Sequence, residues 1–265
     1  MRTLVTGGAG FIGSNLADAL LARGDDVRIL DDLSTGRVEN LPADATLYEG
    51  SITDVDLLRE AMDGAEVVFH QAALGSVARS VDDPLTSDHV NTHGTLAVLQ
   101  TARELGVRRV VQASSSSIYG GADLRPTPEA TPSNPRSPYA VTKHVGEHYA
   151  RVFAELFGLE TVALRYFNVY GPRQRPDSQY AAVIPLFIDA LRAGRSPEVH
   201  GDGLQSRDFA FIDDVVRANL LAAEAPAEAV SGHVYNIAGG RERSLLDLLD
   251  VLRRAIGSDA EPVHV

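Results

Sequence analysis

The sequence predicts an α/β protein with a doubly wound parallel sheet and a smaller, loop-rich lobe. Short runs of Val, Leu and Ile, each about one strand long, alternate with longer stretches that have the composition of helices. A glycine-rich turn follows the first of these runs and precedes the first helical stretch. After Arg165 the alternation becomes irregular, and prolines and glycines become frequent. These observations favour a parallel sheet in the first part of the chain and a less regular lobe in the rest.

The alternation also defines the individual elements. The predicted strands are Thr3–Thr6, Val27–Leu30, Val67–His70, Val110–Ala113 and Thr161–Leu164, and the predicted helices are Phe11–Arg23, Asp54–Met62, Ser87–Leu105 and Arg241–Ile256. Because parallel strands are joined by right-handed crossovers, helices should cover both faces of the sheet. Residues 120–138 are rich in Pro, Thr and Ser and predict a long surface loop.

The composition narrows the class of protein. The chain has 265 residues, 44% hydrophobic and 23% charged, which is typical of globular proteins. Its net charge of −12 disfavours a nucleic-acid or anionic-membrane binder, whose affinity depends on basic surface. No apolar run approaches the roughly 20 residues that span a bilayer, and the first residues do not resemble a secretion signal. We therefore expect a cytoplasmic protein that binds neither nucleic acid nor membrane.

The glycine-rich turn predicts a dinucleotide site. Gly7, Gly10 and Gly13 lie within TGGAGFIG, between the first predicted strand and helix. Such glycines make a tight turn and let the backbone approach a pyrophosphate at the helix N-terminus, as in a Rossmann-type fold. Asp31 ends the second strand. A carboxylate at this position accepts hydrogen bonds from the ribose hydroxyls and repels a 2′-phosphate, so NAD is favoured over NADP. Asp32 is the alternative ribose ligand. Arg37 is either a partial counter-charge to a phosphate or a solvated loop residue.

Tyr139 and Lys143 form a candidate acid/base pair. Their i, i+4 spacing places both side chains on one face of the helix expected after Pro138. An ammonium beside a phenol lowers the pKa of the phenol, as a base near neutral pH requires. Lys143 is the single lysine of the chain. Ser114 to Ser117 follow the predicted strand at Val110. Their hydroxyls either bind a ligand at the carboxyl end of this strand or belong to an ordinary loop.

No metal site is expected. The absence of cysteine excludes disulfides, a thiol nucleophile and zinc–thiolate ligation. His144, Glu147 and His148 match the H-x-x-E-H zinc motif, but this motif overlaps the helix of Tyr139 and Lys143. The carboxylates of the predicted helix near 54–62 are typical of a solvated helix face; they belong to Asp54, Asp56, Glu60 and Asp63.

Taken together, these motifs resemble those of a known family. TGGAGFIG, HQAA, SSSSIYG, SPYAVTK, RYFNVYGPRQ, RDFAFIDD and YNIAGG stand in the same order in the extended short-chain dehydrogenase/reductases. The chain is most similar to the NAD-dependent UDP-sugar 4-epimerases of this family, and the resemblance covers nearly its whole length. It implies a hydride transfer from C4 of the sugar to NAD and its return to the opposite face of a 4-keto intermediate.

The resemblance also implies a domain organisation. Residues 1–170 should form an NAD-binding Rossmann domain and residues 171–265 a substrate-binding lobe, which interleaves with the main domain near 208–240. Members of the family usually continue for several tens of residues beyond the position of Val265. The C-terminus is therefore expected to be truncated or disordered, with part of the uridine site outside this sequence.

Roles at single residues follow from the same resemblance. The catalytic residues would be Ser115, Tyr139 and Lys143. The cofactor would contact Gly7, Gly10, Phe11, Ile12, Gly13, Asp31, Asp32, Ser51, Ile52, Ala72, Asn91, Tyr139 and Lys143. The UDP-sugar would contact Ser115, Ser116, Ser117, Tyr139, Asn168, Arg175 and Arg207.

Some positions depart from the family pattern. Ser51 stands where many members carry an Asp that binds adenine, which puts this contact in doubt. Ser116 and Ser117 replace the Asp-Glu pair of sugar 4,6-dehydratases, which disfavours water elimination. A sugar-nucleotide reductase or dehydrogenase and a non-catalytic NAD-binding sensor are the alternatives, although an intact Ser115, Tyr139 and Lys143 set disfavours the sensor.

The sugar and the oligomeric state are further expectations. HQAALGSV and YAAVIP resemble epimerases of N-acetylhexosamines, whereas Arg175-Pro176-Asp177 resembles the uronate-acting branch. The Arg175 guanidinium could bind a carboxylate bidentately. We therefore predict UDP-glucuronate or UDP-galacturonate as the substrate, with UDP-glucose and UDP-N-acetylglucosamine as alternatives. The resemblance implies a homodimer through the helices at 87–105 and 139–157. The apolar residues assigned to that interface are Val90, Leu96, Val98, Leu99, Val145, Tyr149, Val152, Phe153 and Leu156.

Overall fold

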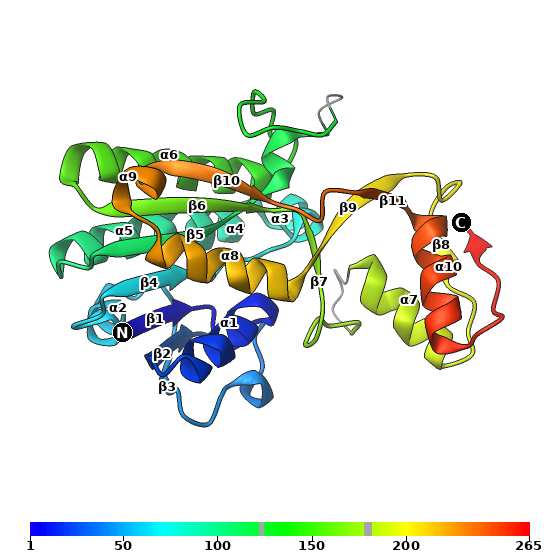
Figure 1. Ribbon diagram of the computed structural model, residues 1–265, viewed down its shortest axis with the longest axis horizontal. Coiled ribbons are helices and arrows are strands. Elements are labelled where there is room, and N and C mark those ends of the chain that lie inside the picture. Colours follow the sequence, from blue (N-terminus) through cyan, green and yellow to red (C-terminus); the bar gives the residue numbers. More distant parts are fainter. Residues whose placement is uncertain (122–124, 178–181) are drawn as a thin grey trace.

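A seven-stranded parallel sheet forms the centre of the computed structural model, which describes residues 1–121, 125–177 and 182–265 (Figure 1). Its strand order is β10-β6-β5-β4-β1-β2-β3. The strands are β1 (Arg2–Thr6), β2 (Asp26–Asp31), β3 (Thr46–Glu49), β4 (Val67–His70), β5 (Arg109–Ser115), β6 (Glu160–Tyr166) and β10 (His233–Ile237). The order reverses between β1 and β4, so the carboxyl ends of these two strands border the crevice in which doubly wound sheets bind ligands. The predicted fold class is confirmed.

All five predicted strands are present, and two strands of the sheet were not predicted. β3 and β10 lie at its two edges, and neither has a fully buried residue. They therefore lack the continuous apolar run by which central parallel strands are recognised. β10 carries part of the YNIAGG segment back to the sheet beside β6.

Helices cover both faces of the sheet (Figure 1). One face packs against α1 (Phe11–Ala22) and α8 (Ile212–Glu224), and the other against α2 (Val55–Met62), α5 (Gly94–Glu104) and α6 (Pro138–Phe157). Neighbouring residues of one strand serve opposite faces, as the alternation of strand side chains requires. Val5 and Phe69 belong to the core on the α1 side, and Leu4 and Val68 to the core on the α6 side.

The predicted helix at 87–105 is interrupted in the structure. A short helix α4 (Pro84–Asp88) follows α3 (Val77–Asp82), continues through one π-helical turn at His89–His93 and then becomes α5. A π turn inserts one extra residue per turn, and such turns often occur at functional sites. Asn91, an expected site residue, lies in this turn and is buried.

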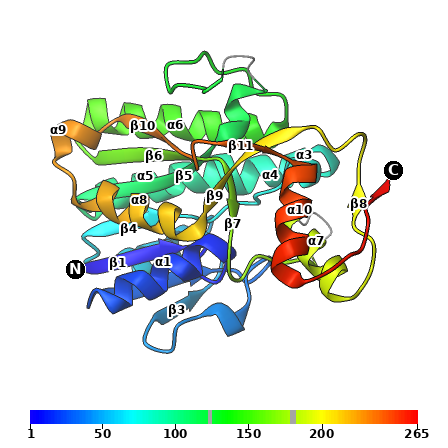
Figure 2. The same ribbon diagram turned by 45° about the vertical axis from the view of Figure 1, so that its right-hand side comes forward.

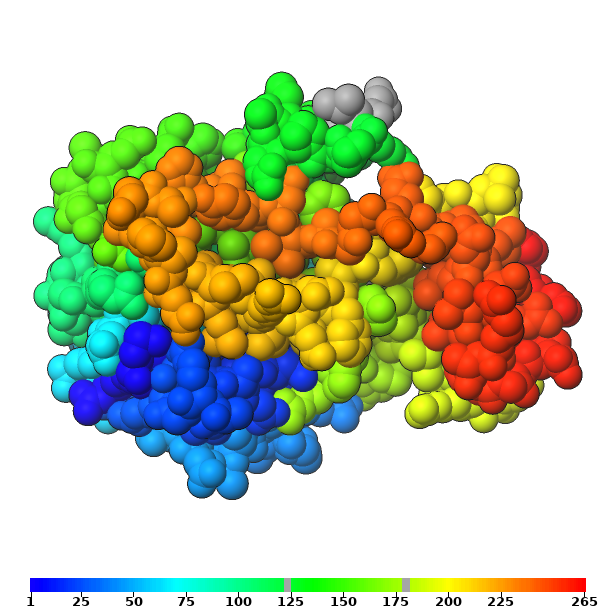
Figure 3. All heavy atoms as spheres, viewed as in Figure 1, coloured from blue at the N-terminus to red at the C-terminus, as the bar shows by residue number. Residues whose placement is uncertain are grey.

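The C-terminal lobe projects from one side of the sheet (Figures 2 and 3). Its core lies between α7 (Val183–Arg192) and α10 (Leu245–Ile256), beside the paired strands β8 (Glu198–Val199) and β12 (Val263–His264). A three-stranded sheet in the order β11-β9-β7 joins it to the main sheet, with β7 (Asn168–Tyr170), β9 (Ser206–Phe211) and β11 (Glu242–Ser244). From β9 the chain returns to the main sheet through α8, α9 (Ala227–Val230) and β10.

The helix predicted at 241–256 starts later than expected. Glu242–Ser244 form β11, which pairs with β9, and α10 begins at Leu245. Ser244 and Asp247 form a capping box, in which each side chain accepts a hydrogen bond from the other residue's backbone N–H. This cap fixes the helix start, because it satisfies backbone donors that the helix leaves without partners.

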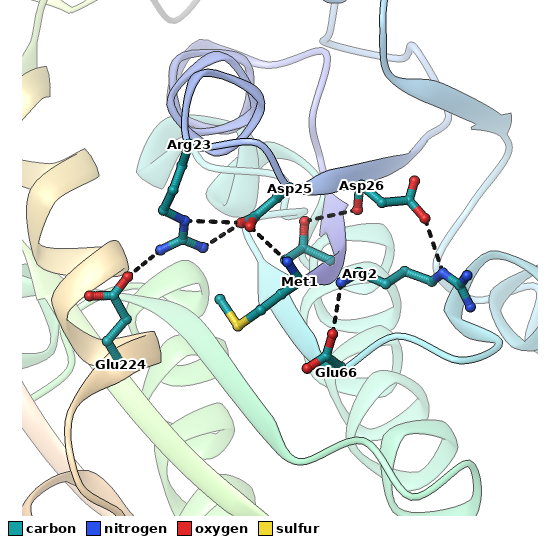
Figure 4. A network of polar contacts seen from close by, with 8 residues as sticks. Met1, Arg2, Arg23, Asp25, Asp26, Glu66 and Glu224 are labelled. Atoms are coloured by element: carbon teal, nitrogen blue, oxygen red, sulfur yellow. Dashed lines mark hydrogen bonds and ion pairs between the residues drawn. The ribbon is translucent and has the colours of Figure 1, made fainter.

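A network of charges anchors the amino end of β1 (Figure 4). The Asp25 carboxylate accepts hydrogen bonds from the Met1 ammonium and from Arg23, and Arg23 also pairs with Glu224 of α8. Burial raises the pKa of Asp25, but the hydrogen bonds from Arg23 and the N-terminus outweigh it and lower that pKa overall. These contacts occupy the end of the sheet opposite the carboxyl ends of its strands.

Within the described parts of the chain, no helix has the length and apolar character needed to cross a membrane.

Candidate active site

The glycine-rich turn forms one wall of a cavity of about 550 Å³. Gly7 has φ +72°, and a Cβ there would lie 2.7 Å from the backbone of Ala72. A Cβ on Gly13 would lie 2.2 Å from the carbonyl oxygen of Gly7. The turn therefore accepts only glycine at both positions, and it brings the N-terminus of α1 against the strands. This is the close backbone approach that a pyrophosphate needs, so the residues present fit NAD.

Most residues expected to contact the cofactor line this one cavity. They are Gly7, Gly10, Phe11, Ile12, Gly13, Asp31, Asp32, Ser51, Ile52 and Ala72. The Asp31 carboxylate accepts hydrogen bonds from the backbone N–H groups of Ala9 and Leu33, both at 2.9 Å. Burial raises the pKa of Asp31. The two backbone donors hold its carboxylate at the end of β2, where a ribose would lie.

Asn91 lies outside the lining of the cavity but holds one of its edges. Its side-chain oxygen accepts a hydrogen bond from the Leu74 N–H at 2.8 Å, and its amide donates to the Leu74 carbonyl at 3.3 Å and to the Thr142 hydroxyl at 3.2 Å. Leu74 lines the cavity, and Thr142 belongs to α6. Asn91 thus joins the cofactor cavity to the helix that carries Tyr139.

Tyr139 and Lys143 lie at the start of α6, beside the end of β5. Ser137 caps this helix by accepting a hydrogen bond from the Ala140 N–H, and Pro138 occupies its first turn. The Lys143 ammonium lies 6.0 Å from the centre of the Tyr139 ring and donates to the Ala113 carbonyl at 2.9 Å. The Ser115 hydroxyl is within hydrogen-bonding reach of the Tyr139 phenol. The three expected catalytic residues are therefore adjacent.

The protonation states of this group differ from the sequence-based expectation. Burial raises the pKa of the Tyr139 phenol, and the hydrogen bond with Ser115 lowers it only in part. Burial lowers the pKa of Lys143 to about 8, although the charge of Glu147 opposes this shift. Lys143 does not bring the phenol into the expected lower range in this arrangement, because its ammonium is directed to the Ala113 carbonyl.

A buried ion pair holds α6 against the sheet. The Glu147 carboxylate accepts hydrogen bonds from Arg165 Nε and Nη2, at 2.8 and 2.7 Å, and from the Ser114 hydroxyl at 2.5 Å. Glu147 and Arg165 are only 6% and 7% exposed. Glu147 is therefore engaged in this network, which removes it from a zinc set with His144 and His148. The described residues contain no group of three or more His, Cys, Asp or Glu side chains that could hold a metal ion.

A second cavity, of about 410 Å³, lies beside the first. Asn168 and Arg207, two expected substrate contacts, line it. Gln174 and Ala182 line both cavities, so the two adjoin at the GPRQ turn. Ser116 and Ser117 lie apart from this lining, in a 3-10 turn (Ser116–Tyr119) that follows β5, and the Ser117 N–H donates to the Ser115 hydroxyl at 3.1 Å.

Arg175 lies in a different place from the one expected. It lines the cofactor cavity together with Asp31 and Thr35, whereas Asn168 and Arg207 line the second cavity. Its guanidinium donates to the Thr35 carbonyl at 3.2 Å and to Asp177 at 3.0 and 3.2 Å. The contact of Arg175 to the sugar therefore stays a prediction, and in this structure its guanidinium is bound to Thr35 and Asp177 at the β2 side of the cofactor cavity.

Sequence reasoning missed residues that position the site. The Ser80 hydroxyl in α3 accepts a hydrogen bond from the Tyr139 N–H at 3.0 Å and donates to the Val77 carbonyl at 2.7 Å. It thereby fixes the first turn of α6. No motif distinguishes Ser80 from an ordinary helical serine. Gln71, Ser76 and Arg79 also line the cofactor cavity, close to the HQAA motif but outside the residues selected from it.

The family model described as the NAD dependent epimerase/dehydratase family matches residues 3–238. The chain belongs to this family. A UDP-glucose 4-epimerase from Mycolicibacterium smegmatis is 44% identical over 99% of this chain and 85% of its own length. A structure of a UDP-glucose 4-epimerase from Thermotoga maritima with UDP-glucose is 40% identical, with a TM-score of 0.96 over 100% of this chain and 85% of that one.

A third similar protein is named for a different sugar. It is a UDP-N-acetylglucosamine 4-epimerase from Methanobrevibacter ruminantium, solved in complex with UDP-N-acetylmuramic acid, and it is 39% identical with a TM-score of 0.95 over 100% of this chain and 84% of that one. Together these findings confirm the expected family, the Rossmann-type fold, NAD as the cofactor and the enzyme class of UDP-sugar 4-epimerases.

Proposed function

We propose that this protein inverts C4 of a UDP-hexose and that Tyr139 is its acid/base. The observation that carries this proposal is the adjacency of Tyr139, Lys143 and Ser115 at the carboxyl end of β5, where α/β sheets bind their ligands. NAD, when bound, supplies the hydride acceptor and donor. The protein's own groups must orient the sugar and move one proton at its 4-hydroxyl.

Each of the three side chains has a separate task in this proposal. The Tyr139 phenol removes the proton of the 4-hydroxyl and later returns it. Ser115 donates to the sugar oxygen and holds it against the phenol. Lys143 supplies the positive charge that favours the phenolate, once its ammonium turns from the Ala113 carbonyl towards Tyr139. Because this environment is buried, each of these interactions acts in a low dielectric.

For the sugar we propose a neutral hexose, with UDP-glucose and UDP-galactose as the pair. Arg207 is the single charged residue among the described residues that line the second cavity. We assign Arg207, which belongs to the RDFAFIDD motif, to the UDP phosphates on the basis of the family resemblance. A hexuronate carboxylate would therefore need a second cationic partner in this cavity. The predicted hexuronate preference depended on Arg175, which is bound to Thr35 and Asp177 instead. The similarity to both a UDP-glucose and a UDP-N-acetylglucosamine 4-epimerase supports a neutral sugar. Tyr180 and Ala181 of the YAAVIP segment lie outside the described residues, and Ala182, Val183 and Ile184 of this segment line the second cavity.

Steady-state assays of C4 inversion test both parts of the proposal. Tyr139→Phe should lower kcat by about 10²–10⁴-fold, the usual contribution of a positioned acid/base, while NAD remains bound. Wild-type kcat/KM should be highest for UDP-glucose, and Arg175→Ala should change the values for UDP-glucose, UDP-N-acetylglucosamine and UDP-glucuronate by the same factor. A selective loss for UDP-glucuronate would restore the hexuronate assignment. Undiminished inversion by Tyr139→Phe would refute the assigned base.

A homodimer is the third part of the proposal. Among the apolar residues assigned to the interface, Val98, Leu99 and Phe153 belong to the core against the sheet and cannot form it. Other apolar side chains on α3, α4 and α6 are exposed and support association through this face: Val77, Val81, Leu85, Val141 and Leu156. Leu85→Glu should convert a dimer into a monomer in light scattering at micromolar concentration. A monomeric wild type under these conditions would refute the dimer.

A further inference from the structure

The segment 171–177 crosses the outer side of the cofactor cavity. At one end, the Pro172 carbonyl accepts a hydrogen bond from Asn15 at 3.2 Å, and Arg173 pairs with Asp18 of α1 at 2.6 Å. At the other end, Arg175 donates to the Thr35 carbonyl at 3.2 Å. Segment 171–177 thus runs from the first helix to the loop that follows β2. It brings the side chains of Arg175 and Asp177 to the cavity wall.

Asp177 is the centre of a three-residue charge cluster at this wall. Its carboxylate accepts hydrogen bonds from Arg175 Nε and Nη2, at 3.0 and 3.2 Å, and it also pairs with Arg37. The hydrogen bond from Arg175 lowers the pKa of Asp177, so the carboxylate is charged at neutral pH. One anion therefore binds two guanidinium groups, one from the region after β2 and one from segment 171–177.

The charge cluster lies near the expected position of the adenosine ribose, the group at which NAD and NADP differ. NADP carries a phosphate on the adenosine ribose, which is placed beside Asp31 at the end of β2. The loop after Asp31 supplies Asp32, Ser34 and Thr35 to the cavity. Arg37 follows this loop, with its N–H donating to the Ala9 carbonyl at 3.0 Å, and Arg175 is bound to Thr35. Arginine residues at this position of a dinucleotide-binding fold accommodate a 2′-phosphate.

We propose that Asp177 is a second determinant of cofactor specificity, which excludes NADP by holding Arg37 and Arg175 in ion pairs and by adding a third negative charge beside Asp31 and Asp32. The Asp31 carboxylate repels the 2′-phosphate directly. Asp177 instead binds the guanidinium groups of Arg37 and Arg175, which would otherwise attract that phosphate. This inference rests on the proposed placement of the ribose beside Asp31.

The test measures which dinucleotide the protein binds, independently of catalysis. Purified protein is incubated with excess NAD and NADP at equal concentrations until the bound ratio is constant, then gel-filtered and heat-denatured. The released dinucleotides are measured by chromatography. Asp177→Asn should raise the bound NADP:NAD ratio about 10-fold over wild type, which corresponds to about 1.4 kcal/mol. Asp177→Ser should do the same, because both variants release the two arginines.

Matched variants separate the mechanism from a general charge effect. Asp189→Asn removes another exposed Asp–Arg pair, with Arg195, far from the cavity lining and should leave the ratio unchanged. Arg37→Ala and Arg175→Ala combined with Asp177→Asn should abolish most of the gain, because this triple variant lacks both arginines that Asp177 binds. Raising the salt concentration should reduce the gain, since these side chains are about half-exposed and screened.

The outcomes are distinguishable. An unchanged ratio in Asp177→Asn would overturn the inference. An undiminished gain in the triple variant would also overturn it, because the freed arginines would then have no role. Asp31→Ser tests the ribose placement by itself. If this variant raises the ratio while Asp177→Asn does not, the placement holds and the role of Asp177 fails; if neither does, both fail.

Discussion

His70 makes the stability of this fold sensitive to acid. Its ring lies at the end of β4, only 3% exposed, between the hydroxyls of Thr6 at 2.8 Å and Thr95 at 2.9 Å. The Thr95 hydroxyl donates its proton to the Asn91 carbonyl at 2.5 Å. It must therefore accept from Nε2–H, which leaves Nδ1 to accept from Thr6. The neutral ring thus has both its nitrogens satisfied.

The size of the effect follows from the shifted pKa. Burial, with a smaller contribution from the charge of Lys143, lowers the pKa of His70 to about 3, whereas an unfolded chain has a value of about 6.5. Between these two values the unfolded state binds more protons at this position than the folded state. Stability is therefore lost as pH falls below about 6.5. At about 1.36 kcal/mol per pH unit, the loss at pH 4.5 is about 2.7 kcal/mol.

Urea unfolding of wild type and His70→Gln measures this loss of stability. Glutamine retains one donor and one acceptor but does not titrate. Both proteins are studied at pH 7.5 and 4.5 with the same NAD concentration, because NAD stabilises the folded state by mass action. Between the two pH values, the free energy of unfolding of wild type should fall by about 2.7 kcal/mol more than that of the variant. Equal decreases in both proteins would show that His70 is protonated in the fold and would refute the reasoning.

Two further predictions concern the turn and the lysine. Gly13→Ala should lower the amount of NAD that copurifies by at least about 10-fold, because its Cβ would lie 2.2 Å from the Gly7 carbonyl oxygen. Gly146→Ala is the control and should retain NAD, because its Cβ would lie 3.6 Å from the nearest atom. Lys143→Met should be more stable than wild type by roughly 2 kcal/mol at pH 7 in urea unfolding. Burial lowers the pKa of Lys143 to about 8, so the folded state must bury a charged ammonium at pH 7. Between about 8 and 10.4 the folded state binds fewer protons than the unfolded state, and wild type gains stability as pH rises. This advantage should shrink as pH rises from 8 to 10.4, and a pH-independent difference would contradict the assignment.

The sequence predicted those parts of the fold whose causes are local. The central strands were recognised because both of their faces are buried, as in the consecutive buried residues of β4. Gly13 and Asp31 were recognised because a pyrophosphate and a ribose impose fixed requirements at a strand–turn–helix junction. The start of α6 was predicted from Pro138, which is a suitable residue for a first helical turn.

The remaining features depend on contacts between distant segments, which spacing does not encode. The position of Arg175 is set by contacts to Thr35 and Asp177, which its residue type alone does not indicate. Val98 and Leu99 were assigned to a subunit interface, although the sheet covers both completely. A helix that packs on a sheet and on a neighbouring helix needs a wide apolar surface, and the sequence does not say which part is covered by the same chain.

The buried Glu147–Arg165 pair opposes local unfolding of the segments that it joins. Arg165 also donates to the Tyr119 hydroxyl at 2.7 Å and to the Glu129 carbonyl at 3.0 Å, and Tyr119 in turn donates to Asn236 of β10 at 2.8 Å. Local separation of any of these segments would leave a charged group without its partners inside the protein, which is costly. The segments around Tyr139 therefore form one cooperative unit. Their backbone amides should exchange with solvent only when the whole sheet unfolds, whereas the loop after β2 exchanges through small local openings.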